Sequence, residues 1–237
     1  MAPSLVGVGV GPGDPELLTV RAIRTLREAE RVFSPTMAED SVGRAESIVR
    51  EAAPDIAVER LVFAILADDE ARATAHRAAA ERITECLDAG EQVAFITLGD
   101  PNVYSTFHHL ADMVRQLRAE AEITTVPGIM AFQDLAARSG TVVVDGSERL
   151  HLVTAVDGPG ALDTPLADPD AAIVIYKGGR HLPQIAEKLE TAGRLDGAIY
   201  GELLGLPGQR LGSLRVSADG PGAYLAAVLV PPTRDQG

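Results

Sequence analysis

Residues 5–15 read Leu5-Val6-Gly7-Val8-Gly9-Val10-Gly11-Pro12-Gly13-Asp14-Pro15. The apolar, β-branched start predicts a strand over 5–10, and the glycines and prolines after it predict a tight turn. Asp14 suits a helix cap and Pro15 a first helical position, so a helix is expected over 16–30. A strand that runs through a glycine turn into a helix is typical of an α/β fold.

The same alternation continues along the chain. Further strands are expected at 31–33, 93–98, 123–126, 150–154, 171–176, 197–200 and 224–230, and helices at 68–89, 104–118, 130–139 and 182–192. The rhythm restarts after Ala119, which predicts two α/β domains, residues 1–120 and 121–237. The segment 158–169, rich in Gly, Pro and Asp, is expected to be an exposed connection.

The first glycine turn does not match the common nucleotide-binding motifs. A G-x-G-x-x-G pattern that begins at Gly7 would need a third glycine where Pro12 stands, and one that begins at Gly9 would need it at Asp14. The chain also has no Gly-Lys-Ser/Thr, so a Walker-type phosphate loop is absent. What remains is either a plain structural turn or a turn whose bare backbone a ligand can approach.

Two later segments repeat this arrangement of strand, tight turn and helix. Thr97-Leu98-Gly99-Asp100-Pro101 ends one strand, and Val126-Pro127-Gly128-Ile129 ends another. Helix capping by Asp100 and a domain junction at Gly128 are the simpler roles. Because ligands of open α/β sheets bind at the carboxyl ends of strands, we expect the turns around residues 11, 99 and 128 to meet at one site.

Composition and charge exclude several classes of protein. The chain has 237 residues, 46% of them hydrophobic, and a net charge of −13 from 21 basic and 34 acidic residues. A core of useful size is expected, and such an acidic chain is a poor partner for nucleic acid. The apolar stretch 223–230 is far shorter than the roughly 20 residues of a membrane helix, and the chain start does not resemble a signal peptide, so we expect a cytoplasmic protein without membrane contact.

Metal and disulfide chemistry have little support. Cys86 is the single cysteine, which excludes an internal disulfide, and a packing role is expected for it. The five histidines include no H-E-x-x-H pattern, and the neighbours His108 and His109 point in different directions on a helix. We therefore expect no metal bound by the protein.

Read in order, three motifs carry a resemblance. They are Gly-Pro-Gly-Asp-Pro-Glu-Leu-Leu-Thr at 11–19, Thr-Leu-Gly-Asp-Pro at 97–101 followed by Tyr-Ser-Thr-Phe at 104–107, and Val-Pro-Gly-Ile at 126–129. Together they closely resemble the tetrapyrrole (corrin/porphyrin) methylases, and Tyr176-Lys177-Gly178 and 202–210 extend the likeness over nearly the whole chain. The resemblance implies two α/β domains with the active site in the cleft between them, usually in a homodimer.

The resemblance also assigns residues. S-adenosylmethionine, the methyl donor, is expected to contact Pro12, Leu98, Gly99, Asp100, Val103, Met130, Ala131, Lys177 and Gly205. Asp14 and Asp100 are the catalytic candidates, as groups that orient substrate nitrogens or balance transient positive charge, and helix capping is their alternative role. In several relatives an Asp after the second strand accepts a proton, but Ser34-Pro35-Thr36 stands there in this chain, so that base cannot be transferred.

The implied activity is S-adenosylmethionine-dependent C-methylation of a reduced tetrapyrrole in cobalamin and porphyrin biosynthesis, with C-20 of precorrin-2 or cobalt-precorrin-2 as the expected target. Another corrin-ring position is the alternative. Two other functions are a ribosomal-RNA methyltransferase, which the acidic charge disfavours, and a non-catalytic binding protein. Donors for the substrate carboxylates are sought among Arg21, Arg44, His108, Lys177, Arg180 and His181.

Overall fold

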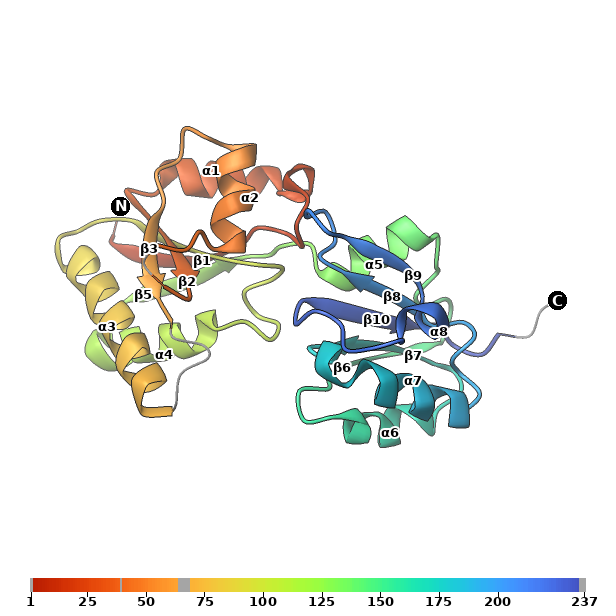
Figure 1. Cartoon of the computed structure of the whole chain (residues 1–237). Helices are drawn as coiled ribbons and strands as arrows, with labels where there is room; N and C mark the ends of the chain where they lie inside the picture. The colour runs from red at the N-terminus through yellow and green to blue at the C-terminus, as the bar shows by residue number, and fades with distance from the viewer. Residues whose placement is uncertain (1, 39, 64–68, 235–237) are drawn as a thin grey trace. The chain divides into compact units, whose positions relative to one another are not determined.

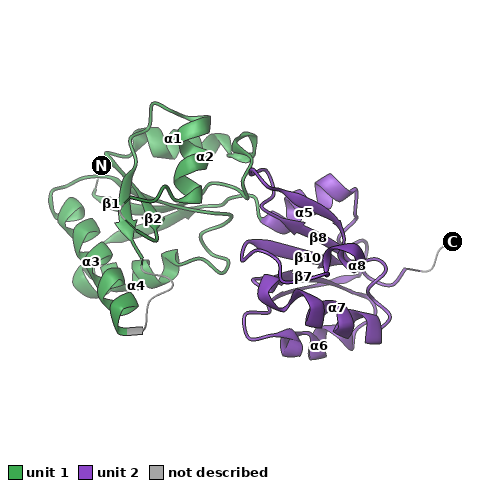
Figure 2. Cartoon of the chain, in the orientation of Figure 1, with its two compact units in different colours: residues 1–130 green, residues 131–237 purple. Residues whose placement is uncertain are grey.

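The computed structural model describes residues 2–38, 40–63 and 69–234, and the chain divides into two compact units, residues 1–130 and 131–237 (Figure 2). The expected α/β class with two sheets is confirmed. The division falls after Met130 and not near residue 120, because the strand at 122–126 pairs with the first strand of the chain. Each unit is described by itself below.

The first unit contains a parallel five-stranded sheet in the order β3-β2-β4-β1-β5 (Figure 1). Its strands are β1 (Ser4–Gly9), β2 (Arg31–Thr36), β3 (Glu59–Val62), β4 (Val93–Thr97) and β5 (Glu122–Val126). All side chains of β4 are buried, as expected for a strand covered on both faces. Because β4, β1 and β5 are adjacent and parallel, their carboxyl ends are neighbours at one edge of the sheet.

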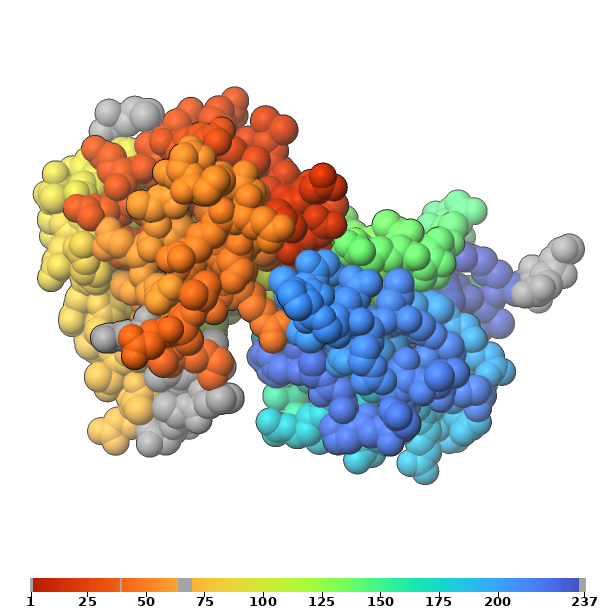
Figure 3. All heavy atoms as spheres, turned by 45° about the horizontal axis from the view of Figure 1, so that its top comes forward, coloured from red at the N-terminus to blue at the C-terminus, as the bar shows by residue number. Residues whose placement is uncertain are grey.

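Helices cover both faces of this sheet. One face packs against α3 (Asp69–Asp88) and α4 (Phe107–Leu117), and the other against α1 (Val20–Glu28) and α2 (Arg44–Ala52). The outer surface of the second face is formed by α1 and α2, drawn in red to orange in Figure 3. Phe95 faces the first layer while Ala94 and Ile96 face the second, which is the alternation of a strand. The strands β1 and β4 are adjacent, yet the helices that follow them, α1 and α4, lie on opposite faces.

The first helix begins later than its sequence indicates. Asp14 accepts a hydrogen bond from the amide of Glu16 at 3.0 Å and caps only a 3₁₀ turn, η1 (Pro15–Leu17). The α-helix proper begins at Val20, where the Thr19 hydroxyl accepts from the amide of Ala22 at 3.0 Å. Two capping residues therefore follow each other, and the turn they enclose carries the glycine segment toward the helix.

The second unit has its own five-stranded sheet, in the order β6-β7-β10-β8-β9, in which β10 is antiparallel to β7 and β8 (Figure 1). Its strands are β6 (Arg149–Thr154), β7 (Ala171–Tyr176), β8 (Ile199–Glu202), β9 (Arg210–Ser213) and β10 (Ala226–Val230). The helix α5 (Ala131–Ser139) packs on one face, and α7 (Leu182–Thr191) on the other with η2 (Pro159–Leu162), α6 (Asp163–Leu166) and α8 (Leu214–Ser217). A last 3₁₀ turn, η3 (Gly179–His181), precedes α7.

The segment 158–169 is more ordered than expected. It forms η2 and α6, and Leu162 and Pro165 are buried in them. The sequence did not indicate these short helices, because a cluster of Gly, Pro and Asp residues predicts a loop. Nearby, the buried guanidinium of Arg194 donates to the carbonyls of Ala171 at 2.8 Å and Pro231 at 2.7 Å, which ties the start of β7 and the residue after β10 to the turn after α7.

Cys86 lies in the core between α3 and the sheet, 2% exposed. Burial and a hydrogen bond with Glu91 raise the pKa of its thiol to about 11, so it stays protonated at neutral pH. The packing role expected of this residue agrees with that environment. In the part of the chain that is described, no helix is both long and apolar enough to cross a membrane.

Candidate active site

The three turns meet at the carboxyl edge of the first sheet. The amide of Gly99 donates to the carbonyl of Gly11 at 2.8 Å, which joins the turn after β4 to the turn after β1. A Cβ placed on Gly128 would lie 2.0 Å from the carbonyl oxygen of Gly99, and one on Gly9 would lie 2.6 Å from the amide nitrogen of Gly128. Only glycine permits such close approach of three backbones, so the expected meeting of the turns is confirmed.

Asp100 connects two of these turns through its carboxylate. One oxygen accepts from the amide of Asn102 at 2.8 Å, and the other from the amide of Gly128 at 3.0 Å. The side chain of Asn102 donates in turn to the hydroxyl of Thr125 on β5 at 3.1 Å. These contacts give Asp100 a positioning role that its sequence context did not reveal, and its catalytic role stays a prediction.

Asp14 and the end of β2 complete this edge. The carboxylate of Asp14 is used at least in part as the cap of η1, so its catalytic role also stays a prediction. Ser34 and Thr36, at the position of the missing acidic base, are buried, and the Thr36 hydroxyl donates to the carbonyl of Ser41 at 2.7 Å. Two buried hydroxyls therefore stand where a carboxylate base was sought.

The location of the turns is that of a ligand site in open α/β sheets. Connections from the adjacent strands β1 and β4 leave toward opposite faces. Ligands of open α/β sheets bind outside the carboxyl ends of the strands at such a point. The predicted donor contacts of the first unit all lie on the turns at this edge or on their continuation: Pro12, Leu98, Gly99, Asp100, Val103 and Met130.

The remaining predicted contacts share one edge of the second sheet. Lys177 follows β7, and Gly205 lies just after β8. Both strands run antiparallel to β10, so their carboxyl ends lie at the same edge of the sheet. Ala131 begins α5, whose second residue, Phe132, donates its amide to the hydroxyl of Tyr176 at 2.9 Å. The structure therefore groups Ala131 with the Tyr176-Lys177 pair inside this unit.

Backbone strain is concentrated at these edges. Among the described residues other than glycine, only Tyr104, Lys177 and Leu203 have positive φ, at 49°, 57° and 53°. A left-handed conformation costs a side-chain-bearing residue roughly 1–2 kcal/mol, and such strain collects at functional sites. All three residues follow strands β4, β7 and β8 directly or within the same loop. Single-sequence reasoning had no signal for this strain.

Comparison with known proteins identifies the family of the chain. Residues 4–218 match the family model described as Tetrapyrrole (Corrin/Porphyrin) Methylases. The chain belongs to the tetrapyrrole methylase family. It is 35% identical to the precorrin-2 C(20)-methyltransferase of Sinorhizobium sp, over 98% of this chain and 96% of that protein. It is 28% identical to the cobalt-precorrin-2 C(20)-methyltransferase of Salmonella typhimurium, over 95% of each.

Solved structures agree on the fold. The putative cobalamin synthesis related protein CobF from Corynebacterium diphtheriae superposes with a TM-score of 0.72 at 20% identity, covering 99% of this chain and 100% of that one. Cobalt precorrin-4 methyltransferase CbiF gives 0.71 at 18% identity, covering 96% and 94%. The family and fold expected from the motifs are thus confirmed for this methylase.

A buried polar cluster stands beside the second edge of the methylase. Glu202, 6% exposed, accepts from the Tyr200 hydroxyl at 2.5 Å, the Ala223 amide at 2.6 Å and Arg210 at 3.2 Å. Burial raises the pKa of Glu202, but these hydrogen bonds outweigh burial and lower it overall. The cluster fixes the loop before β10 against the end of β8. Its members are scattered in sequence, so no local motif announced it.

The basic residues proposed to bind substrate carboxylates differ in their ion pairs and hydrogen bonds. Most arginines of the methylase form ion pairs, whereas Arg21, Arg44 and Arg180 form none within the described part of the chain and are exposed. His108 is held through Nδ1 against the carbonyl of Ser105 at 2.7 Å, and His181 lies 3.2 Å from the carbonyl of Val156. The three free arginines are thus available for anionic groups of a substrate. Within the residues described, no group of three or more His, Cys, Asp or Glu side chains is arranged to hold a metal ion.

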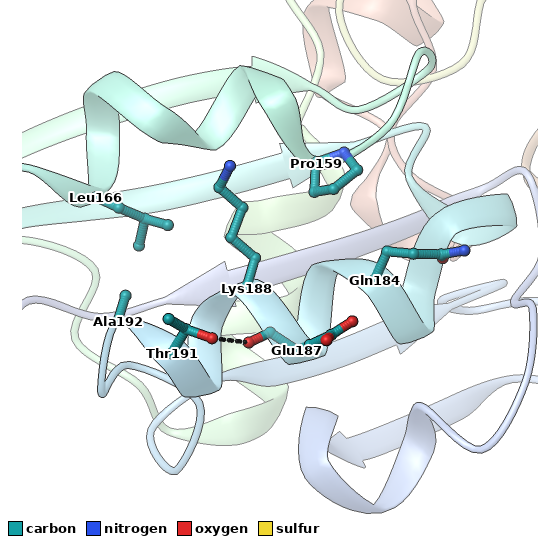
Figure 4. A pocket seen from close by; sticks show the side chains of 7 residues that line it. All are labelled: Pro159, Leu166, Gln184, Glu187, Lys188, Thr191 and Ala192. Carbon is teal, nitrogen blue, oxygen red and sulfur yellow. Dashed lines mark hydrogen bonds between the residues drawn. The ribbon is translucent and has the colours of Figure 1, made fainter.

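The second unit also has a hollow of about 560 Å³ on its helical face, lined by Pro159, Leu166, Gln184, Glu187, Lys188, Thr191 and Ala192 (Figure 4). These residues come from η2, α6, α7 and the residue that follows α7, and none of them was predicted to be a site residue. Lys188 is paired with Asp163, and the Thr191 hydroxyl donates to the carbonyl of Glu187 at 3.0 Å. Its polar groups are therefore partly committed, and the strand edges are the better site.

Proposed function

We propose that this tetrapyrrole methylase transfers a methyl group from S-adenosylmethionine to C-20 of precorrin-2 or of its cobalt form, in cobalamin biosynthesis. The observation that carries the proposal is the meeting of Gly9, Gly99 and Gly128 at one sheet edge, in a chain that is 35% identical to a precorrin-2 C(20)-methyltransferase. Another ring position is the second candidate, supported by the fold shared with a precorrin-4 enzyme.

The residues fit a donor of this kind. S-adenosylmethionine, when bound, supplies a methyl group made electrophilic by a sulfonium. The glycine turns offer close backbone approach, and the turn at Asp100 is held by two amide hydrogen bonds, so the binding surface is fixed before the ligand arrives. We expect the backbone of Gly99 and the side chain of Val103 to contact it in the first unit, and Lys177 and Gly205 in the second.

Positioning is expected to dominate catalysis. An electron-rich bridge carbon of the acceptor forms the new carbon–carbon bond while the sulfur–carbon bond breaks and its electron pair stays on sulfur. The cationic adduct then loses the proton of that carbon to a solvent water molecule. Fixed geometry between two reactants can supply about 7 kcal/mol or more of the barrier reduction. The cationic adduct is acidic enough for a weak acceptor such as water, so no carboxylate is needed where Ser34 and Thr36 stand.

The test is to incubate the protein with S-adenosylmethionine and either precorrin-2 or cobalt-precorrin-2 and to determine the mass of the macrocycle. One added methyl group in either arm supports the proposal, and carbon-13 from a labelled donor methyl locates the position. The absence of an added methyl group in both arms rejects it.

We also propose that the protein is a cytoplasmic homodimer. Light scattering on the purified protein tests its oligomeric state.

Substitution of Asp14 by Asn tests its catalytic assignment. An amide oxygen still accepts from Glu16, so the variant is expected to fold and to bind the donor normally, while loss of the negative charge slows methyl transfer about 10-fold or more. Asp112→Asn is the control, because Asp112 is exposed and forms an ion pair with Arg115 on the surface of α4. Turnover by Asp14→Asn equal to that of the control refutes the assignment.

A further inference from the structure

Tyr104 is an exposed aromatic residue in a strained backbone conformation. It is 44% exposed and has φ of 49°, a region that non-glycine residues rarely enter. Phe33, Phe63, Phe95 and Phe107 of the same unit are buried in its core. In a unit that otherwise hides its phenyl rings, Tyr104 adopts an unfavourable conformation that holds its ring outward.

The residues around Tyr104 keep it in this conformation. Pro101 is buried on one side, and on the other the buried hydroxyl of Ser105 bonds the hydroxyl of Thr97 at 2.9 Å. Ser105 also accepts from the amide of Phe107 at 3.1 Å, at the start of α4. The loop is therefore anchored to β4 and to the core at both ends, and strain survives only where the surroundings enforce it in this way.

The position of Tyr104 favours contact with the tetrapyrrole acceptor over contact with the methyl donor. Gly99 and Asp100 occupy the point where the turns meet, and Tyr104 lies four residues beyond Asp100, in the loop that leads into α4. A donor held at the meeting point has one small flat group, whereas a tetrapyrrole is a broad ring that must extend past the turns. An outward aromatic ring with a hydroxyl can pack on the face of such a ring or donate to a carboxylate at its rim.

We propose that Tyr104 is a substrate-contacting residue whose phenol ring packs against the acceptor macrocycle and not against the methyl donor. This inference rests on the proposed function. The anchored loop fixes the backbone of Tyr104 before the acceptor binds, which lowers the cost of ordering this residue at that moment.

The test compares Tyr104→Asn with Tyr104→Phe, and with Leu117→Asn as control. Asn tolerates positive φ but removes the ring, and Phe keeps the ring. Leu117 is 45% exposed on the opposite end of α4. Wild-type turnover of the macrocycle is measured first, and its absence means that the proposed function has failed independently of Tyr104. The variants are then compared in KM for the macrocycle, in Kd for S-adenosylhomocysteine by calorimetry, and in Tm.

For Tyr104→Asn we expect a KM for the acceptor raised about 10-fold, a donor-site Kd within about twofold of wild type, and a Tm that is equal or higher because the strain is relieved. Tyr104→Phe should keep a KM close to wild type. An unchanged KM in Tyr104→Asn overturns the proposal, and so does a raised donor-site Kd with unchanged KM, which assigns the ring to the donor. Equal losses in both Tyr104 variants overturn ring packing, and a lowered Tm with every parameter worsened marks the residue as structural.

Discussion

Replacing Gly128 with alanine tests the meeting of the three turns directly. The new Cβ would lie 2.0 Å from the carbonyl oxygen of Gly99, where a carbon–oxygen contact needs about 3.3 Å. The φ of Gly128 is not positive, so alanine brings no backbone strain and the effect is steric alone. Relieving the overlap requires the turns to separate by about 1.3 Å, at a cost of about 1–3 kcal/mol. The hydrogen bond from the Gly128 amide to Asp100 is expected to lengthen with it.

Calorimetric titration with S-adenosylmethionine and S-adenosylhomocysteine measures the consequence. If the donor site is built on these turns, the same 1–3 kcal/mol raises Kd roughly 5- to 150-fold and lowers Tm, by about 2–4 °C per kcal/mol for a chain of this size. Gly212→Ala is the matched control, because its Cβ meets no atom within 4 Å and its φ is not positive. Donor affinity and Tm equal to those of the control would contradict the close approach of the turns.

Two further predictions concern stability. Arg194→Met removes the donors to the buried carbonyl of Ala171 and the partly buried carbonyl of Pro231. It should lower the free energy of unfolding by about 1–3 kcal/mol for each acceptor left unpaired. Denaturant titration against Arg24→Met, on the exposed surface of α1, measures this loss, and equal midpoints would contradict it. Glu202 has a lowered pKa in the folded protein, so its stabilisation is present above about pH 4.5 and is lost as the pH falls through the folded value. The Tm gap between wild type and Glu202→Gln should therefore be widest near pH 7 and narrow below pH 4.5, and a gap independent of pH would refute this account of the carboxylate.

The fold could be predicted in its alternation but not in its long-range pairing. Hydrophobic runs located β1, β4, β7 and most helices, because a local pattern decides whether a segment is a strand or a helix. The assignment of 122–126 to the first domain depends on its pairing with Ser4–Val8, which no local pattern encodes. The late start of α1 was missed because Asp14 and Thr19 are both good caps, and only the path of the chain after β1 decides between them.

The sequence predicted the glycine turns of the candidate site but not the long-range hydrogen bonds and backbone torsions that hold them. Gly99 and Gly128 were recognised because a glycine directly after a strand marks a place where the backbone turns sharply or is approached closely. Two hydrogen bonds, from Gly128 to the carboxylate of Asp100 and from the Ala223 amide to Glu202, join residues that are 21 or more positions apart. The strain at Tyr104 depends on a backbone torsion. Composition and motif spacing indicate neither long-range contacts nor torsions.

The buried, protonated thiol of Cys86 makes the protein convenient for labelling. A thiol with a pKa of about 11 and 2% exposure reacts slowly with maleimides at neutral pH, so a cysteine introduced at an exposed position such as Leu117 would take a fluorophore selectively without removal of the native one. Fluorescence from such a reporter could then follow ligand uptake in a chain that has no tryptophan of its own.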